Sequence, residues 1–237
     1  GENVASFERE FAEYIGVKHA IGVNSGTDAL ILSLKAIGIV PGDEVITTPF
    51  TAIPTYSAIV ATGATPIFAD IDPNTFLIDI EKIPAQITNK TKAVIPVHLF
   101  GNVVDVDVLR SKIDTKIAIL EDCAQSTGAT LKGKRTGALG DISAFSFYPT
   151  KNLGGYGDGG MICTNNSDWS ERLRRIRMYG MINKDQFIED GINSRLDELQ
   201  AAMLRVKLPS LDKMNKLRME LDTLYRSLLD PQFVTFP

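Results

Sequence analysis

The 237-residue sequence is poor in the residues that build disulfide frameworks and metal centres. It holds two cysteines, Cys123 and Cys163, and two histidines, His19 and His98. Each cysteine lies in an apolar segment and neither belongs to a CxxC pair, which argues against a disulfide framework and against a zinc site. Two histidines are also too few for a histidine-rich metal centre.

Long apolar runs and an excess of basic charge are missing as well. We find no signal peptide and no segment apolar enough to span a bilayer, so we expect a cytoplasmic protein. The net charge of −4 argues against a broad nucleic-acid-binding surface. A small anionic ligand is still compatible with this charge, because backbone amides and a few side chains can hold one. Repeats and low-complexity segments are not found.

What is present is the composition of a globular protein, with 44% hydrophobic and 23% charged residues. Short apolar segments alternate with helical patterns along most of the chain. The predicted strands are 19–23, 44–48, 65–69, 92–97, 116–120, 142–147 and 161–164; the predicted helices are 6–15, a stretch reaching 36, 52–62 and 105–113. Near-continuous apolar strands between helices indicate a three-layer α/β/α fold with a mainly parallel sheet.

The last part of the chain has a different character. From Ser194 the pattern is helical, with a break at Pro209 and a second helix that reaches about Leu229. This second helix is amphipathic and has the composition of an exposed element. We therefore expect it to leave the main domain.

Two glycine-rich motifs match nucleotide-binding patterns but lack the required context. Residues 155–160 fit GxGxxG, yet a strand-like segment follows them, whereas the dinucleotide fingerprint must open a helix. Residues 128–134 fit GxxxxGK, but Arg135 stands where serine or threonine should bind magnesium, and no helical pattern follows. We interpret both as turns.

A third motif, Asp70, Ile71 and Asp72, follows a predicted strand. A metal-dependent nucleotide-sugar glycosyltransferase carries such a DxD pair, whose carboxylates bind magnesium or manganese. The simpler interpretation, which we favour, is a strand end followed by a turn at Pro73 and Asn74. The glycosyltransferase stays as an alternative function.

Three other elements together suit a phosphorylated aldehyde cofactor. Lys151 follows an apolar strand and a proline turn, where desolvation favours the neutral amine that Schiff-base formation needs. Asp122 ends another apolar strand, where a carboxylate can pair with a protonated pyridine nitrogen. The spacing agrees equally well with Asp122 as the N-cap of a following helix. Residues 24–28 lie between a strand and a helix, where the backbone amides of the helix N-terminus can bind a phosphate. A helix-capping sequence that binds no ligand would show the same pattern.

These segments resemble the DegT (DegT/StrS-type) family of sugar aminotransferases, which are fold-type-I pyridoxal-phosphate enzymes. The matching stretches occur in the family's order, cover nearly the whole chain, and include FEREFAEYIGVKHAIGVNSGTDAL, PGDEVITTPFT, PVHLFG, EDCAQSTGA, GDISAFSFYPTKNLG and NSRLDELQAA. The resemblance implies the large domain of the aspartate aminotransferase-like fold, with pyridoxal 5'-phosphate as cofactor.

The resemblance also assigns roles at the reacting end of the cofactor. Lys151 matches the lysine that forms the Schiff base with the cofactor and later moves the proton between substrate and cofactor carbons. Asp122 matches the partner of the pyridine nitrogen, and Gln125 matches the residue near the ring hydroxyl. A few family members that dehydrate sugars carry histidine in place of the lysine, and Lys151 argues against that version.

At the phosphate end, Gly26, Thr27 and Ser146 match residues that contact the phosphate. Asn193 matches an asparagine that reaches the phosphate bound in the neighbouring subunit. The resemblance therefore implies a homodimer with shared active sites, acting by ping-pong transamination on an amino-acid donor, expected to be glutamate, and a nucleotide-linked keto sugar.

The chain departs from the family pattern in two places. Many members have an aromatic residue that stacks on the cofactor ring where this chain has Ala52, so that Phe50 or His98 is a candidate to cover the ring; His98 can equally be a core histidine. Family chains also continue into a C-terminal small domain. We expect a cofactor-binding large domain at 1–208 and, at 209–237, the connecting helix and the start of a truncated small domain, and a non-catalytic remnant that binds cofactor or a partner remains an alternative.

Overall fold

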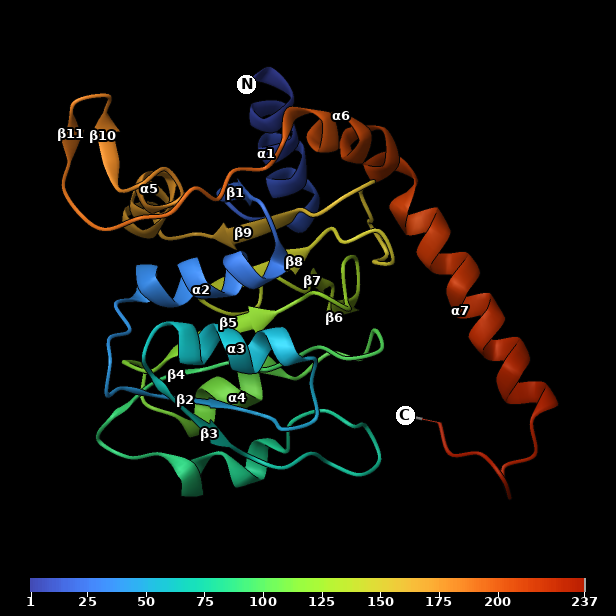
Figure 1. The fold of residues 1–237 in the computed structure, drawn as a ribbon. Coiled ribbons are helices and arrows are strands. Elements are labelled where there is room, and N and C mark those ends of the chain that lie inside the picture. The colour runs from blue at the N-terminus through green and yellow to red at the C-terminus, as the bar shows by residue number, and fades with distance from the viewer. Residues whose placement is uncertain (237) are drawn as a thin grey trace.

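A seven-stranded sheet forms the centre of the molecule (Figure 1), and the computed structural model describes residues 1–236. The strands, in the order β1-β9-β8-β5-β4-β2-β3, are β1 (His19–Val23), β9 (Gly160–Thr164), β8 (Ile142–Ser146), β5 (Ala118–Asp122), β4 (Thr91–Val94), β2 (Glu44–Thr47) and β3 (Thr65–Phe68). Strand β9 runs antiparallel to both of its neighbours, and all other pairs are parallel. The predicted mainly parallel sheet is confirmed.

Helices cover both faces of this sheet. They are α1 (Glu2–Ile15), α2 (Gly26–Ile37), α3 (Ile53–Ala61), α4 (Val106–Lys112), α5 (Ser167–Ile176), α6 (Glu198–Lys207) and α7 (Leu211–Leu228). Helices α3 and α4 belong to parallel crossovers that run in opposite directions along the sheet, so right-handed connections place them on opposite faces. Helix α2 packs against α3, α5 and β8, and α1 packs against α6 and β1. The result is the three-layer α/β/α architecture expected from the sequence.

An aromatic cluster fixes α1 over strand β8. Phe7 and Phe11 of α1 are fully buried against Phe145 and Phe147. Phe145 belongs to β8, and Phe147 directly follows that strand. Phe11 meets Phe145 edge to face with ring centroids 5.0 Å apart, a favoured geometry for aromatic pairs. This packing holds the carboxyl end of β8 in place, from which the chain runs on to Lys151.

The boundaries differ from the predicted ones in a few places. Strand β5 lies two residues later than predicted and so ends on Asp122 itself, while α1 begins at Glu2, earlier than predicted. Pro209 lies in a short 3-10 helix, η3 (Leu208–Ser210), which separates α6 from α7 as the predicted break requires. Helix α5 and two small hairpins were outside the prediction: β6 (Thr130–Leu131) with β7 (Lys134–Arg135), and β10 (Met181–Asn183) with β11 (Gln186–Phe187).

Helix α7 extends away from the main body (Figure 1), as predicted, and its first turns are anchored there. The Tyr14 hydroxyl donates to Asp212 at 2.5 Å, and the Asn215 amide donates to the Thr127 carbonyl oxygen at 2.9 Å. Farther along, apolar side chains such as Leu221 are exposed. Within residues 1–236, no helix has both the length and the apolar character that a membrane span requires.

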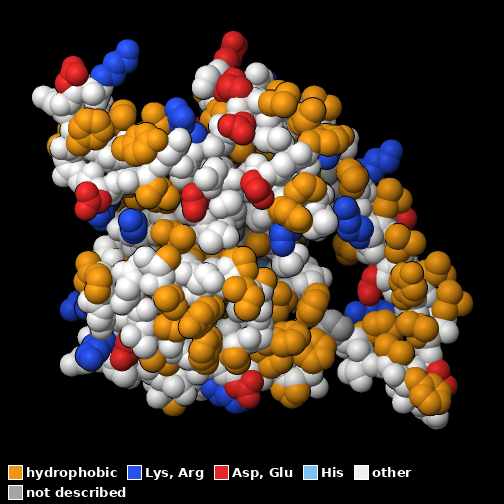
Figure 2. All heavy atoms as spheres, viewed as in Figure 1, with side chains coloured by type: hydrophobic (Ala, Val, Ile, Leu, Met, Phe, Trp, Pro, Cys, Tyr) orange, Lys and Arg blue, Asp and Glu red, His pale blue; other side chains and the backbone are white. Residues whose placement is uncertain are grey.

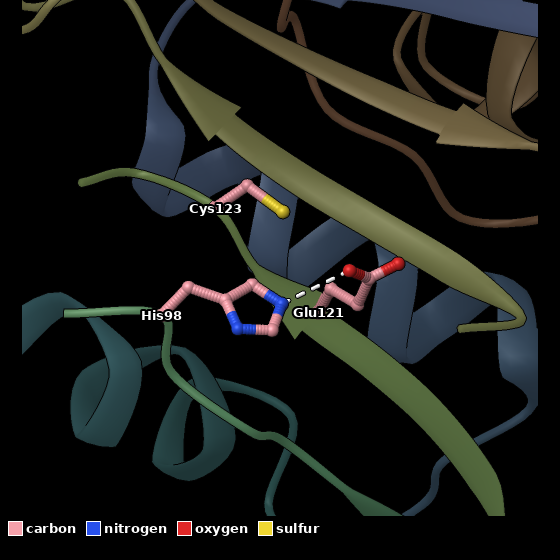
Figure 3. Close-up of side chains that lie close together, drawn as sticks. All are labelled: His98, Glu121 and Cys123. Carbon is pink, nitrogen blue, oxygen red and sulfur yellow. Dashed lines mark hydrogen bonds and ion pairs between the residues drawn. The ribbon is translucent and has the colours of Figure 1, made fainter. Parts of the chain in front are cut away.

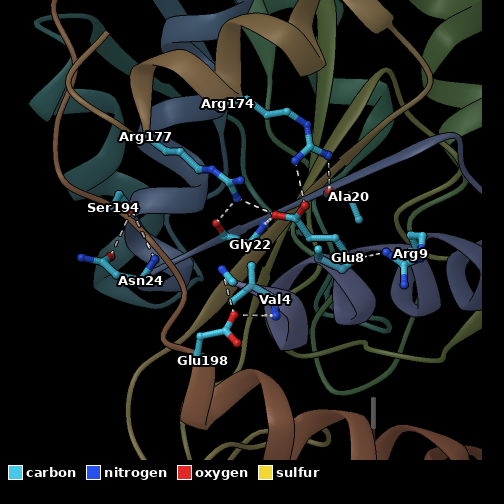
Figure 4. A network of polar contacts seen from close by, with 12 residues as sticks. Val4, Glu8, Arg9, Ala20, Gly22, Asn24, Arg174, Arg177, Ser194 and Glu198 are labelled. Carbon is cyan, nitrogen blue, oxygen red and sulfur yellow. Dashed lines mark hydrogen bonds and ion pairs between the residues drawn. The ribbon is translucent and has the colours of Figure 1, made fainter. Parts of the chain in front are cut away.

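Strand β1 lies at one edge of the sheet, and side chains satisfy its outward-facing backbone groups (Figure 4). The Glu8 carboxylate accepts the Gly22 N–H at 2.8 Å. Arg177 donates to the Gly22 carbonyl oxygen at 2.7 Å, and Arg174 donates to that of Ala20 at 3.2 Å. Both arginines also pair with Glu8, at 2.5 Å for Arg177 and 2.7 Å for Arg174. This ion-pair triad joins α1, β1 and α5 and occupies a strand edge that would otherwise be free to pair.

Replacing Glu8 with glutamine is expected to lower the free energy of unfolding by roughly 3 kcal/mol, because it leaves the largely buried Arg177 without its charged partner. Burial alone raises the pKa of Glu8, but Arg177, Arg174 and the Gly22 N–H together hold it below the ordinary value of 4.5. A lowered pKa in the folded state means that this contribution is present above pH 4.5 and is lost as the pH falls further.

Urea unfolding of both proteins at about pH 6 and about pH 3 measures this effect. We expect the difference between Glu8→Gln and the wild type to shrink at the lower pH. Glu10→Gln is the matched control, because Glu10 lies on the same helix and pairs with Arg205 at the surface, where an ion pair contributes about 1 kcal/mol or less. A loss as small as that of the control, or one independent of pH, would contradict the role given to the triad.

Candidate active site

A cavity of about 250 Å³ opens at the carboxyl ends of the parallel strands, where open α/β sheets bind their ligands. It is walled by the first turns of α2 and α3, by the ends of β5 and β8, and by the loop from β8 to β9. Six of the seven residues predicted to form the site line this one cavity: Gly26, Thr27, Asp122, Gln125, Ser146 and Lys151.

One end of the cavity is suited to an anion. Ser25 caps α2 by accepting the Asp28 N–H at 3.1 Å, so this segment does contain a helix cap, and the cap leaves room for a ligand. The cap leaves the N–H groups of Gly26 and Thr27, which have no acceptor within the helix, at the positive end of its dipole. A Cβ added to Gly26 would lie 2.6 Å from the Ser146 Cβ, so only glycine keeps this approach to β8 open.

Asp122 lines the same cavity and is 4% exposed. One carboxylate oxygen accepts the Thr55 hydroxyl at 2.8 Å and the other accepts the Ala124 N–H at 3.1 Å. Burial raises the pKa of Asp122, while these two donors and the nearby Lys151 charge act to lower it. Turns follow at 123–128, so the N-cap interpretation of Asp122 is wrong, and the carboxylate is available to a cationic group in the cavity.

Lys151 lies in the turn that follows β8, and its backbone N–H donates to the Tyr148 carbonyl oxygen at 2.8 Å. The side chain is partly buried. Burial lowers the pKa of Lys151, and the Asp122 carboxylate acts in the opposite direction. The lowered pKa increases the fraction of neutral amine, which is the form that attacks an aldehyde carbon.

Neither candidate for covering a cofactor ring lines the cavity. Phe50 lies at the surface against Phe76 and Phe100, with ring centroids 5.8 Å and 6.4 Å away. His98 is fully buried in the core. Ala52, which stands where many family members have an aromatic residue, does line the cavity.

His98, Glu121 and Cys123 form a buried cluster with metal-ligating side chains (Figure 3), but the ligand atoms of His98 and Glu121 already have partners. His98 accepts the Val104 N–H at 3.1 Å through Nδ1 and meets Glu121 at 2.9 Å through Nε2. Glu121 also accepts three backbone N–H groups, from residues 137, 139 and 140. Burial, with Glu121 nearby, raises the pKa of Cys123 and favours its thiol form. The hydrogen bonds of His98 and Glu121 thus have a structural role and hold the chain next to Asp122 in place.

Asn193 is the one predicted site residue that lies elsewhere. It is exposed, in the segment before α6, where it bridges to Met178 and accepts a hydrogen bond from Arg195 at 3.0 Å. The family resemblance implies that Asn193 reaches the phosphate of the neighbouring subunit, and it does not line this chain's own cavity.

The look-alike motifs adopt the turn conformations predicted for them. Residues 155–160 lead into β9 and not into a helix, and residues 128–134 include β6 and the turn of the β6–β7 hairpin. Asp72 accepts the N–H groups of Asn74 and Thr75 at 2.7 Å and 3.1 Å, as the predicted turn requires. The Asp70 and Asp72 pair therefore gives the glycosyltransferase alternative no support.

Thr51 and Thr55 belong to the site but were not predicted. Both line the cavity from the start of α3, and the Thr55 hydroxyl contacts Asp122. The sequence pattern did predict that a strand ends and a helix begins near these two residues. The contact itself joins residues 67 positions apart and depends on how α3 crosses the sheet.

Comparison with families of known proteins matches residues 1–233 to the DegT/DnrJ/EryC1/StrS aminotransferase family. The chain is 46% identical over 228 residues to dTDP-3-amino-3,4,6-trideoxy-alpha-D-glucose transaminase of Streptomyces venezuelae, an alignment that covers 96% of this chain and 60% of the relative. Across three curated relatives, this chain spans between 57% and 62% of their length.

Solved structures give the same picture. The chain superimposes with a TM-score of 0.93 and 46% identity on S. venezuelae DesV in complex with a ketimine intermediate, covering 96% of this chain and 62% of that chain. Bacillus subtilis NtdA with bound cofactor PMP has a TM-score of 0.82 and 36% identity, over 90% of this chain and 48% of that chain.

Proposed function

This chain belongs to the DegT/DnrJ/EryC1/StrS aminotransferase family, and from that premise we propose that it binds pyridoxal 5'-phosphate and forms the catalytic part of a sugar aminotransferase. The inferred reaction moves an amino group from an amino acid, with glutamate as the expected donor, to a nucleotide-linked keto sugar. The observation that carries the proposal is that one cavity holds a lysine, a buried carboxylate and the first N–H groups of helix α2.

The cavity residues fit this cofactor. The cradle between Gly26 and Ser146, which a Cβ would fill, suits the phosphate, with Thr27 beside it. Asp122 offers a buried carboxylate for the ring nitrogen. Gln125 would lie near the ring hydroxyl. Lys151, with its lowered pKa, would bond to the aldehyde carbon.

Each of these side chains then has a defined task. When bound, the cofactor supplies an electron sink for the pair of electrons released at the substrate carbon. Asp122 holds a negative charge at the ring nitrogen and keeps that nitrogen protonated. Lys151 would hold the cofactor covalently, and its free amine would carry a proton at Nζ to and from the substrate. The α2 N-terminus keeps the phosphate fixed during both half-reactions.

The direct test supplies the protein with pyridoxal phosphate, glutamate and a dTDP-linked or UDP-linked keto sugar. We expect 2-oxoglutarate and an amino sugar to form together, detected by mass spectrometry. Bound cofactor without 2-oxoglutarate would identify a non-catalytic remnant. Manganese-dependent release of the nucleotide, without use of glutamate, would identify a glycosyltransferase.

Replacing Gly26 with alanine is expected to weaken cofactor binding at least tenfold, because the added methyl group displaces the phosphate cradle from β8. The measurement is a fluorescence titration with pyridoxal phosphate. Ser33→Ala is the matched control on the same helix, since the Ser33 hydroxyl is buried without a partner in the described chain and its removal should cost little. Unchanged affinity in Gly26→Ala would contradict the assignment of the phosphate site.

We also propose that the protein is a homodimer with shared sites, in keeping with the exposed position of Asn193. Hydrophobic side chains gather on the surface over α3 (Figure 2), where Ile53 is 73% exposed. The exposed apolar residues of this region are Phe50, Ile53, Tyr56, Val60 and Phe68. A contiguous apolar patch of this kind is typical of an interaction surface, and a second copy is the partner we infer.

Mixing two inactive variants tests the shared site. Lys151→Ala removes a group from the chain's own cavity, and Asn193→Asp places a negative charge against the phosphate in the partner's. After random exchange of subunits, half of the dimers are mixed and each has one intact site, so about a quarter of wild-type activity should return. Activity no higher than the mean of the two variants would contradict sharing.

The domain organisation remains part of the proposal. We assign residues 1–208 to the cofactor-binding large domain and 209–237 to the connecting helix and the beginning of a small domain. The anchored first turns and the exposed remainder of α7 support this division. Pro237 lies outside the described residues.

A further inference from the structure

The first turn of α3 provides a hydroxyl group for Asp122. Thr55 is 1% exposed, and its Oγ1 donates to Asp122 Oδ2 at 2.8 Å. The second oxygen, Oδ1, accepts the Ala124 N–H at 3.1 Å. Each carboxylate oxygen thus has one fixed donor, and the two donors together determine how the carboxylate plane is turned in the cavity.

Thr51 extends this contact into a chain of hydroxyl groups. Its Oγ1 lies 2.9 Å from that of Thr55, and both residues line the cavity. The Asp122 carboxylate accepts the Thr55 proton, so Thr55 in turn accepts from Thr51, and bonds in such a chain strengthen one another. Asp122 also lies at the N-terminal end of α3, where the helix dipole favours a negative charge.

A purely structural role does not account for this hydroxyl. Residue Ala52 occupies the N-cap position of α3, and no side chain caps the helix there. The contacts that the Thr55 hydroxyl makes are with Thr51 and Asp122, which belong to the cavity. A valine has almost the same shape as threonine, so packing around α3 does not require the hydroxyl group.

We propose that Thr55 is a positioning residue, which keeps Asp122 charged and aimed at the cofactor's ring nitrogen, with Thr51 supporting it. The inference rests on the proposed function, because it assigns Thr55 a role only if Asp122 meets that nitrogen. Without the Thr55 hydroxyl, the buried carboxylate loses one of its two donors and binds a proton more readily. A protonated Asp122 no longer keeps the ring nitrogen protonated, and the electron sink is weakened.

The variants that test this are Thr55→Val, which removes the hydroxyl group, and Thr55→Ser, which restores it. The decisive readout is the 15N chemical shift of pyridoxal phosphate labelled at the ring nitrogen, which reports the protonation of that atom. We expect the Thr55→Val shift to move toward the unprotonated value and kcat to fall about tenfold with little change in KM. Thr55→Ser should recover both, and Thr51→Val should show the same changes to a smaller extent.

The outcomes separate this inference from the proposed function. If the wild type binds no labelled cofactor, the proposed function fails. If the wild type binds it and Thr55→Val keeps the protonated shift, the role of Thr55 is wrong while the function stands, even where the melting temperature falls. If Thr55→Val does not fold, Thr55→Ala with the same readout decides between the two results.

Discussion

Replacing Lys151 with alanine should abolish covalent attachment of pyridoxal phosphate and lower the rate of the glutamate half-reaction by at least about a thousandfold. General acid–base catalysis alone contributes roughly 10²–10⁴, and the loss of the covalent bond adds to this. The expectation follows from the position of Lys151 in the cavity with Asp122 and from its lowered pKa. Single-turnover absorbance after mixing with glutamate measures the rate.

Two controls make the result specific to the amine of Lys151. Lys116→Ala removes an exposed lysine from a surface turn and should behave as the wild type. Adding a small primary amine to Lys151→Ala should restore part of the rate, since the amine can enter the vacated space and carry the proton. A Lys151→Ala protein that keeps a wild-type rate would remove Lys151 from the mechanism.

Replacing Asp122 with asparagine is expected to lower kcat at least about a hundredfold while raising the melting temperature of the cofactor-free protein at neutral pH. The loss of activity arises because a neutral amide no longer stabilises the protonated ring nitrogen. The gain in stability arises because the pKa of Asp122 is raised by burial. Because the pKa of Asp122 is higher in the folded than in the unfolded protein, protonated Asp122 stabilises the fold at low pH. That stabilisation is lost as the pH rises through the folded-state pKa, so the ionised carboxylate opposes folding at neutral pH.

The structure accommodates the asparagine. Its oxygen can keep the Ala124 N–H, and its amide can donate to Thr55, whose hydroxyl then donates elsewhere. Thermal melts at about pH 7 and about pH 3 measure the difference, which we expect to vanish at the lower pH, where Asp122 is itself protonated. A melting temperature below that of the wild type at pH 7 would show that the buried charge is not a cost to the fold.

Much of the site was open to prediction because its residues stand where one element ends and the next begins. Asp122 and Lys151 follow apolar strands, and residues 24–28 precede an apolar helix, so periodicity alone placed them near one edge of a parallel sheet. Periodicity left two roles undecided, the N-cap role of Asp122 and the role of His98, and the three-dimensional structure decides both. Turns after Asp122 exclude a helix cap, and partners for both His98 nitrogens identify a core histidine.

Other features depend on contacts that no local pattern encodes. Thr55 reaches Asp122 across 67 residues. Glu8 on α1 pairs with Arg174 on α5 and with Arg177, which follows α5, across more than 160 residues. Helix α5 was not among the predicted helices, although the sequence carries its signals: Leu173 and Ile176 lie on its buried face at helical spacing, and Asn166 caps it by accepting the Trp169 N–H. The role expected of Asn193 follows from the family resemblance, and no contact within this chain indicates it.

The most direct test of the central claim is peptide mapping after borohydride reduction of the protein with bound pyridoxal phosphate. Reduction makes the bond between lysine and cofactor permanent, so mass spectrometry locates it. We predict one dominant modified peptide, with the cofactor on Lys151, at a cofactor concentration that leaves the exposed lysines unmodified. A label spread over surface lysines, or fixed at a lysine outside the cavity, would contradict the assignment of this cavity as the cofactor site.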